Sequence, residues 1–315
     1  MKPRHRESRL IILFATLFLL AFSAPAMAAF EASFLYSLSD FTGLIPYSWP
    51  RISVDEERNE VYVLYANLFR IFNEVGMEVY RFGDDLDLGN IADMAIEPSG
   101  DILLLAYKES KGEIIHCNYR GVPKSTHWLS NLPDEFSKFS PNRMIYRLGN
   151  LYFLSPLEMK IVVTDGQGIF KKGYDLISLL EQEEKDRGNI EVTGFSMDKE
   201  GNILFTVSTL FRACILSPEG KIDWFGKPGS LPGKFNIVGG ITRDSKGNYL
   251  VVDKLKCAVM VFDKSFNFIT QFGYRGMKSD NLIVPNDIAI DNKDRIYVTQ
   301  AGRNRGISVF RLSYN

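Results

Sequence analysis

Apolar and polar residues alternate along this chain in short runs that recur at a nearly constant interval. Six units each begin with an alternating stretch, turn through a polar segment that often contains Gly or Asn, and return as a more strongly apolar stretch. The opening stretches are residues 52–55, 94–97, 144–147, 195–198, 241–244 and 288–291. Their last residues lie 42, 50, 51, 46 and 47 positions apart. Alternation of this kind is typical of half-buried strands, so each unit is predicted to open with a β-hairpin.

The polar turns contain the residues that tight hairpins require. Gly100 and Gly247 lie in two of them, and glycine adopts a positive φ without steric cost. In the fifth unit, two further apolar stretches follow at 259–262 and 268–272. Four short antiparallel strands every ~45 residues match the period of a β-propeller blade. We therefore predict an all-β fold of six blades, with one short amphipathic helix at 175–185 between the third and fourth blades.

The two ends of the chain predict how the ring closes. The sixth unit stops after its third strand, at 307–312, whereas the strand-like stretch 33–38 precedes the first unit without a partner. The pattern of this N-terminal stretch matches the fourth strand of the fifth unit. Closure of a ring removes the exposed strand edges that invite aggregation. The sequence therefore predicts a six-bladed β-propeller whose last blade is completed by the N-terminal strand.

Two stretches near the C-terminus, 229–262 and 284–310, share a more specific pattern. Its features are a Gly-rich lead-in, an apolar-x-Asp strand end, a Gly-Asn turn, the run Val251-Val252-Asp253 and a closing Val-Phe pair. On these features the chain resembles NHL-repeat proteins of the exported, bacterial type. The resemblance implies a six-bladed propeller. It leaves the function open, because this fold hosts substrate modules of ligases, lyases, lactonases and binding scaffolds.

The N-terminus has the three parts of an export signal. A basic segment at 2–9 precedes an apolar run of 13 residues at 10–22, and a small-x-small cleavage motif ends at Ala28. The apolar run is short for a membrane span, which needs ~20 residues. We predict a signal peptide at 1–28 and a propeller at 29–315 that is periplasmic or secreted, with no membrane span after cleavage. An uncleaved N-terminal anchor is the alternative.

Charge and cysteine content exclude several classes of function. The chain has 37 basic and 38 acidic residues, and loss of the signal region removes four basic and one acidic residue, leaving 33 and 37. This mild acidity provides no basic surface for nucleic acid. Cys117, Cys214 and Cys257 are an odd set without a C-x-x-C pair, which disfavours zinc ribbons, disulfide scaffolds and attached haem. We expect these cysteines to be small buried hydrophobic residues.

The candidate ligand site lies at the mouth of the central channel, where the geometry of a propeller places a concave surface. Loops leading into the innermost strands supply its polar residues. These candidates are Arg51, Asp93, Asn142, Arg143, Asn286 and Asp287. Two arginines and two aspartates near a shared axis are able to bind a polar ligand, or to pair with one another and organise water. The sequence leaves both interpretations open.

Two groups of propeller enzymes set the alternatives for chemistry at this mouth. The peptide-amidating lyases of the NHL group resemble this fold and use a histidine-bound zinc. His116 and His127 are predicted on outer strands of the second blade, and two imidazoles there cannot supply that site. Gluconolactonase-like propellers hold calcium with Glu, Asn and Asp ligands, which the mouth asparagines and aspartate partly match. The Glu expected before the first blade is absent, and residues 237–240 carry no carboxylate, so we predict no metal and no cofactor.

Apolar residues in the loops between second and third strands predict a protein-binding surface. They are Leu68, Phe69, Leu157, Leu210, Phe211 and Leu255. Large apolar residues in exposed loops often mark an interface, although these residues are equally able to pack between neighbouring blades. We predict an exported, non-catalytic propeller that serves as a protein-interaction or ligand-binding scaffold for an unidentified protein partner. The alternative is a channel-mouth hydrolase or lyase of the calcium-dependent, lactonase-like type.

Overall fold

The computed structural model describes most of the chain downstream of the predicted signal peptide. The described residues are 30–40, 43–44, 48–83, 87–301 and 306–314 of 315. The predicted signal peptide and its cleavage site lie outside them. None of the described helices is long and apolar enough to cross a membrane.

The described chain divides into two units of very different size. The large unit is Ala32–Leu312, and the small one contains Phe30, Glu31, Ser313 and Tyr314. Within the small unit, the rings of Phe30 and Tyr314 meet edge to face with their centroids 5.7 Å apart. The candidate residues named above all belong to the large unit.

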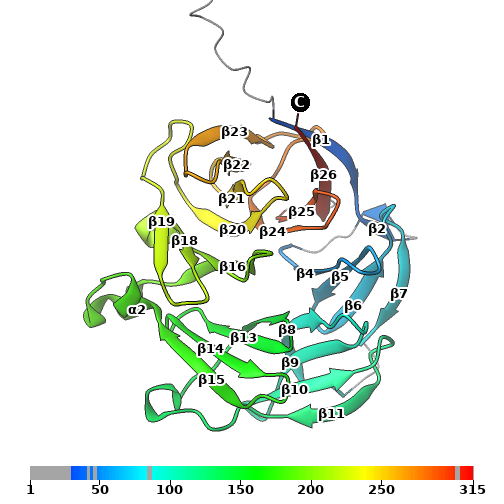
Figure 1. Ribbon diagram of the computed structural model, residues 1–315. Coiled ribbons are helices and arrows are strands. Elements are labelled where there is room, and N and C mark those ends of the chain that lie inside the picture. The colour runs from blue at the N-terminus through cyan, green and yellow to red at the C-terminus, as the bar shows by residue number, and fades with distance from the viewer. Residues whose placement is uncertain (1–29, 41–42, 45–47, 84–86, 302–305, 315) are drawn as a thin grey trace, which may run out of the picture. The chain divides into compact units, whose positions relative to one another are not determined.

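The large unit is a ring of six four-stranded sheets (Figure 1). Each sheet contributes one innermost strand. These strands are β4 (Arg51–Asp55), β8 (Asn90–Ile96), β12 (Arg143–Arg147), β16 (Val192–Met197), β20 (Val238–Arg243) and β24 (Pro285–Ile290). Every innermost strand contacts the next one along the chain, and β24 contacts β4. The ring is therefore closed, and all six predicted opening strands form its inner wall.

The remaining strands lie outward in chain order, as the alternating pattern predicts. The second strands are β5 (Glu60–Tyr65), β9 (Ile102–Lys108), β13 (Asn150–Ser155), β17 (Ile203–Val207), β21 (Tyr249–Asp253) and β25 (Arg295–Gln300). The third strands are β6 (Leu68–Phe72), β10 (Lys111–Cys117), β14 (Lys160–Asp165), β18 (Arg212–Leu216), β22 (Ala258–Phe262) and β26 (Ile307–Tyr314). The fourth strands are β7 (Glu78–Phe82), β11 (Pro123–His127), β15 (Phe170–Asp175), β19 (Ile222–Phe225), β23 (Phe268–Phe272) and β1 (Phe30–Ser37). A two-stranded ribbon, β2 (Ser39–Asp40) with β3 (Gly43–Leu44), follows β1.

The hairpin between the first and second strands of a blade is held by an aspartate at the end of the innermost strand. In the fifth blade, the Oδ1 atom of Asp244 accepts hydrogen bonds from the backbone N–H groups of Lys246 and Asn248, at 2.9 and 2.8 Å. Gly247 lies between them with φ of +87°, a conformation that favours glycine. The apolar-x-Asp and Gly-Asn signals in the sequence therefore mark this turn.

The predicted closure of the ring is confirmed. Strand β1 pairs with β26 as the outermost strand of the sixth blade. The Leu38 amide donates to the Ile307 carbonyl at 3.0 Å, and the rings of Phe34 and Phe310 meet edge to face at 5.7 Å. The Leu38 side chain is fully buried in a cluster that also contains Val61 of the first blade. The N-terminal strand thus joins the last blade to the first.

The single helix predicted at 175–185 is wrong. The chain forms one α-helical turn, α2 (Leu176–Leu179), and a separate 3-10 helix, η2 (Glu184–Asn189). Asp175 caps α2 by accepting a hydrogen bond from the Ile177 amide at 3.0 Å. Leu176 and Ile177 are buried between the third and fourth blades, and Glu181 has a positive φ of 55° that ends the helical path. Burial of these side chains, rather than helix propensity, sets the local backbone.

The three cysteines are buried and free, as the sequence analysis expected. Burial raises the pKa of the Cys117 thiol to about 12 and raises the pKa of the Cys214 thiol as well. Two further short elements, η1 (Asp134–Phe136) and η3 (Ser208–Leu210), lie in loops. These elements and the cysteines contribute packing and no reactive group.

Candidate functional site

The innermost strands all start on one face of the ring, which we call the mouth face. A cavity of about 290 Å³ opens there. Its polar and charged lining residues come from five of the six blades and from their loops on this face. They are Arg51, Asn142, Arg143, Glu191, Thr193, Lys254 and Asn286. Four of the six predicted ligand residues therefore line one cavity, and the other two, Asp93 and Asp287, lie behind it.

Arg143 reaches across the central channel. It starts β12 in the third blade, and its guanidinium pairs with Asp93 of the second blade and Asp287 of the sixth. The distances are 3.2 Å from Nε to Asp93 Oδ2 and 3.0 Å from Nη2 to Asp287 Oδ2. The Asp93 carboxylate also accepts the Met144 amide at 2.9 Å. Since the third and sixth blades are opposite one another in a six-bladed ring, this one side chain bridges the channel.

Both aspartates are 6% exposed, so the bridge is a buried ion-pair network. Burial alone would lower the pKa of Arg143, but the charges of Asp287 and Asp93 outweigh this effect and raise its pKa. Arg143 borders the mouth cavity and also a second cavity of about 220 Å³ further along the channel. The bridge therefore lies between the linings of the two cavities, and its carboxylates are already paired with a cation.

Arg51 lies beside this bridge without a partner of its own. It is the first residue of β4 and is half-buried. In the described part of the chain, no carboxylate lies within 4.0 Å of its guanidinium and no acceptor is placed to hydrogen-bond with it. The neighbouring charge of Arg143, followed by burial, lowers the pKa of Arg51. The Arg51 guanidinium, with its five N–H donors, thus faces the cavity without an acceptor among the described residues.

Lys254 is a second cation at the mouth, and the sequence analysis missed it. It follows β21 and is half-buried, with its Nζ atom 5.7 Å from the centre of the Trp49 ring. Burial lowers the pKa of Lys254, while the charges of Asp287 and Glu191 act in the opposite direction. The described residues place no carboxylate within ion-pairing distance of it. The mouth cavity therefore presents two unpaired cations.

Asn142, Thr193, Asn286 and Glu191 complete the polar wall. Asn142 and Glu191 are exposed, whereas Asn286 is half-buried within β24. Glu191, which the sequence analysis also missed, precedes β16 and faces solvent at the rim. The same positional rule that identified Asn142 would have identified Glu191, because both lie just before an innermost strand.

Close packing explains why the fifth blade supplies no carboxylate to the mouth. A Cβ atom on Gly239 would lie 2.3 Å from the Asn286 carbonyl oxygen, and one on Gly240 would lie 2.6 Å from Asp287 Oδ1. Both contacts are shorter than real Cβ atoms make. Only glycine lets the fifth innermost strand approach the sixth this closely.

The predicted ring of apolar loop residues is only partly exposed. Phe69 is fully buried and stacks on Phe82 at 4.6 Å, so its assignment to a partner surface is wrong. Leu68 is half-buried, and Leu210 and Phe211 pack partly against the blade cores. The loops are tight turns, and their neighbouring side chains fill the interfaces between blades. That alternative, which the sequence left open, applies to these positions.

Leu157 and Leu255 do project from the mouth face, and they are 71% and 63% exposed. Three further apolar residues, Trp49, Ile237 and Val284, lie just before innermost strands and are 47%, 45% and 37% exposed. We call these five residues the apolar rim. Leu157 itself lines the cavity, so the rim and the charged mouth are continuous.

Two rim residues have strained backbone. Trp49 has φ of 54° and Val284 has φ of 44°, a region that side chains with a Cβ rarely adopt and that is especially unfavourable for a β-branched residue. The Trp49 indole Nε1 donates to the Val284 carbonyl at 3.0 Å and joins the first blade to the sixth. Strain of this kind persists where surrounding structure enforces it, and it concentrates at functional sites.

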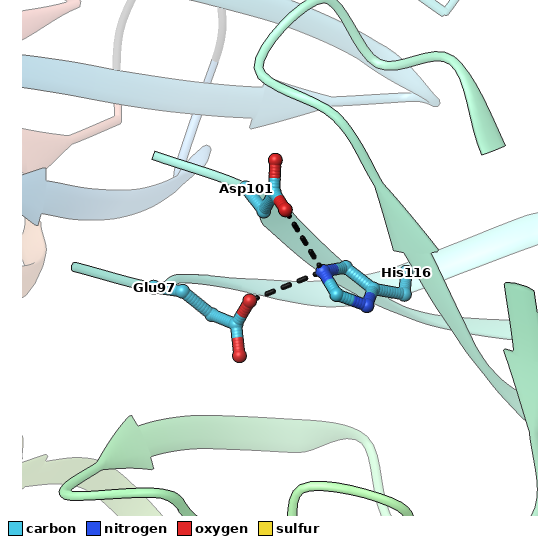
Figure 2. A group of neighbouring side chains, drawn as sticks. All are labelled: Glu97, Asp101 and His116. Atoms are coloured by element: carbon cyan, nitrogen blue, oxygen red, sulfur yellow. Dashed lines mark ion pairs between the residues drawn. The ribbon is translucent and has the colours of Figure 1, made fainter. Parts of the chain in front are cut away.

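A second charged cluster lies at the opposite end of the second blade. Figure 2 shows the His116 ring pointing between Glu97 and Asp101, with its Nε2 atom 3.1 and 3.3 Å from one oxygen of each carboxylate. Ligand atoms around a tetrahedral zinc lie about 3.3 Å apart, so the spacing by itself fits a metal site. The Lys124 ammonium, however, is 2.5 Å from the same oxygen of Asp101. Its hydrogen bond lowers the pKa of Asp101 and places a positive charge where a metal ion would bind.

This cluster is therefore best described as an ion-pair network that joins the β8–β9 turn to β10 and β11. His127 lies on β11, where its Nε2 atom is 3.0 Å from the Ser125 hydroxyl. Both histidines occupy the outer strands of the second blade, remote from the innermost strands. The described part of the mouth thus contains no histidine.

Comparison of sequences finds two similarities. The family described as "6-bladed beta-propeller" matches residues 236–314, which form the fifth and sixth blades. Protein brain tumor of Drosophila melanogaster is 26% identical over 118 residues, covering 35% of this chain. The match spans 11% of that protein's length, so it shows only a local similarity.

Comparison of structures finds the same fold in proteins of several kinds. A Bacteroides thetaiotaomicron protein of unknown function has a TM-score of 0.63 at 13% identity, covering 90% of this chain and 76% of that one. A gluconolactonase from Xanthomonas campestris has a TM-score of 0.57 at 13% identity, covering 92% and 93%. Virginiamycin B lyase from Staphylococcus aureus, in a catalytically inactive form with a histidine replaced by alanine, has a TM-score of 0.54 at 13% identity, covering 86% and 83%. At these identities the likeness shows the fold alone, and together with the match of residues 236–314 it establishes the chain as a six-bladed β-propeller.

Proposed function

We propose that this protein is an exported, non-catalytic binding module that takes up its partner on the mouth face. The observation that carries the proposal is the Arg143 bridge. Asp93 and Asp287 are buried carboxylates that face the channel at the mouth, and both are paired with Arg143 at hydrogen-bonding distance. A general acid or base must be free to exchange a proton with a substrate, and a calcium ligand must be free to donate its oxygen to the ion. A buried guanidinium between the two carboxylates opposes both roles.

The apolar rim supports a protein partner. Non-obligate protein interfaces combine exposed apolar side chains with a polar surround, and large exposed apolar residues on one face commonly mark such a surface. Leu157 and Leu255 stand on the third and fifth blades, at the edge of the charged cavity. Export is supported by the basic segment, the apolar run and the cleavage motif before Ala29. N-terminal sequencing of the mature protein is expected to begin at Ala29.

The competing function is a hydrolase or lyase that acts at the channel mouth, since a gluconolactonase and a virginiamycin B lyase share the fold. That lyase is inactive when one histidine becomes alanine, whereas the described mouth of this chain has none. A calcium site built on Asn142, Asn286 and Asp287 would lie next to two arginines. Their positive charge would oppose a divalent cation.

The test compares binding on the two faces of the ring. Leu157→Glu with Leu255→Glu is expected to abolish co-purification of the partner from the producing cells. The matched control is Leu148→Glu, since Leu148 is 85% exposed in the β12–β13 turn on the opposite face. All variants are expected to melt within about 2 °C of the wild type, because surface substitutions rarely exceed ±0.5 kcal/mol. Equal loss of the partner in both variants would contradict a mouth-face interface.

The enzyme alternative has its own readout. Thermal melts are recorded with and without calcium for the wild type and for Asp287→Ala. We expect no calcium-dependent shift in either protein. A midpoint that rises with calcium concentration by mass action, and only when Asp287 is present, would overturn the proposed function.

A further inference from the structure

We infer that the mouth cavity is an oxyanion-binding site in which Arg51 and Lys254 together hold a carboxylate or phosphate group. The inference deepens the proposed function and rests on it, because it names the chemical group that the mouth recognises. The group belongs either to a small free anion or to an acidic residue of the bound partner. The chemistry of recognition is the same in both cases.

The Arg51 guanidinium has hydrogen-bond donors without acceptors in the described part of the chain. It is half-buried and borders the cavity. N–H donors that lose water without gaining a partner destabilise the folded protein, so unpaired arginines are uncommon at partly buried positions. The planar fork of N–H groups matches the two oxygens of a carboxylate or phosphate. An oxyanion at this place would satisfy the donors that the chain leaves open.

Lys254 approaches the same cavity from the fifth blade. Its ammonium lies near the Trp49 ring, and the Lys254 amide donates to the Ile237 carbonyl at 2.8 Å, which anchors the loop. Arg51 and Lys254 come from different blades, the first and the fifth, and border one cavity of about 290 Å³. Two cations that converge on a space of this size are suited to a group with two or three negatively charged oxygens.

The carboxylates around the cavity are either paired with Arg143 or exposed at the rim. Asp93 and Asp287 are matched by Arg143 and lie behind it, where both are 6% exposed. Glu191 is the remaining carboxylate at the cavity, and it is exposed at the rim, where solvent screens its charge. The wall that a ligand meets is therefore formed by Arg51 and Lys254. The amides of Asn142 and Asn286 and the Thr193 hydroxyl add neutral hydrogen-bonding groups around them.

The depressed pKa values of the two cations agree with this geometry. The positive charge of Arg143 and burial lower the pKa of Arg51, and burial lowers the pKa of Lys254. The negative charge of an anion bound between Arg51 and Lys254 would raise both pKa values. Binding is therefore expected to favour the protonated form of Lys254 and to weaken as the pH rises through its lowered pKa, below the ordinary lysine value of 10.5.

The experiment measures the affinity of the purified protein for three probes: inorganic phosphate, succinate and a short peptide with a single aspartate flanked by leucines. Isothermal titration is done at constant ionic strength, with chloride as the counter-ion. We expect saturable binding of at least one probe, weakened tenfold or more by Arg51→Gln and by Lys254→Gln. The matched control is Lys221→Gln, because Lys221 is a well-exposed lysine beside β19 and is expected to leave the affinity unchanged.

Conservative variants separate recognition from a loss of folding. Lys254→Arg is expected to retain binding and to abolish its weakening at alkaline pH, because arginine stays protonated there. Lys254→Gln is expected to bind weakly at every pH. Circular dichroism of each variant checks that the propeller is folded. Binding that has the same alkaline dependence in Lys254→Arg would show that another group is titrating and would overturn the assignment of Lys254.

The outcomes distinguish this inference from the proposed function. Preference for the peptide over phosphate and succinate identifies an acidic residue of the partner, and the reverse identifies a free anion. No binding of any probe, with partner capture still dependent on Leu157 and Leu255, would overturn the oxyanion site and leave the binding module intact. Conversion of a bound probe into product would overturn the non-catalytic function while confirming the site.

Discussion

Replacing Arg143 by methionine tests whether the bridge across the channel holds the mouth together. The substitution keeps an unbranched side chain of similar length and removes the charge. It leaves Asp93 and Asp287 buried, each 6% exposed, without the cation that now lies 3.2 and 3.0 Å from their oxygens. Removal of one partner from a buried ion pair commonly costs 3–5 kcal/mol, because the other charge stays buried and uncompensated.

The expected loss here lies at the lower end of that range. Asp93 keeps the Met144 amide at 2.9 Å and Asp287 keeps the Ile288 amide at 3.0 Å, and Arg51 remains nearby as a positive charge. We therefore expect Arg143→Met to lower the free energy of unfolding by about 3 kcal/mol. For a chain of this size that corresponds to a fall of about 6–12 °C in the melting midpoint.

Urea denaturation followed by circular dichroism measures the loss, with the slope m confirming that the extent of unfolding is unchanged. A triple variant that also carries Asp93→Asn and Asp287→Asn is expected to recover much of the stability, because no uncompensated charge remains. A deficit below 0.5 kcal/mol, or one that the asparagine substitutions do not relieve, would refute the account of the bridge.

Three further predictions follow from packing and charge. Phe69→Ala is expected to lower the free energy of unfolding by about 3–5 kcal/mol in the same urea assay, because the ring is fully buried. Leu157→Ala, at a position that is 71% exposed, should change it by less than about 0.5 kcal/mol. Deletion of residues 29–40 removes β1 and the buried Leu38, so the protein should lose several kcal/mol of stability and melt at a lower temperature. An unchanged melting midpoint would mean that the ring closes without this strand. His116→Phe is expected to cost on the order of 1 kcal/mol by leaving Glu97 and Asp101 side by side, and added zinc should stabilise neither the variant nor the wild type. Zinc stabilisation of the wild type alone would show that the cluster of Figure 2 is a metal site after all.

The blades could be predicted from the sequence because each is specified locally. The apolar alternation, the terminal aspartate and the glycine turn all fall within about 15 residues in the fifth blade, and Asp244 uses its own neighbours to form the turn. Closure was predictable as well, since a strand without a partner at one end matched a missing strand at the other. These signals do not depend on how distant residues meet.

The charged site could be predicted only as a set of residues. Arg143 and Asp287 are 144 positions apart, and nothing in the local pattern indicates that one bridges the channel to the other. Lys254 could not be predicted, because a single lysine beside the apolar Leu255 carries no local signal that its ammonium enters the channel mouth. Phe69 was placed at the surface because a residue beside a turn can point either outward or into the interface between blades. Side-chain direction at such positions is decided by packing against the next blade.

The apolar rim and the two unpaired cations share the mouth face, and this has a consequence for binding. Arg143 borders both the mouth cavity and the cavity deeper in the channel, so a ligand that enters from the mouth face meets the bridge. The apolar rim lies on the same face, and Leu157 belongs to the rim and also lines the mouth cavity. Under the proposed function, a partner seated on the rim would cover an anion held by the two cations, and each would then change the affinity of the other by an equal factor. A free anion would be trapped beneath the partner, and an acidic residue of the partner would itself fill the cavity, so in either case the two parts of the surface act as one site.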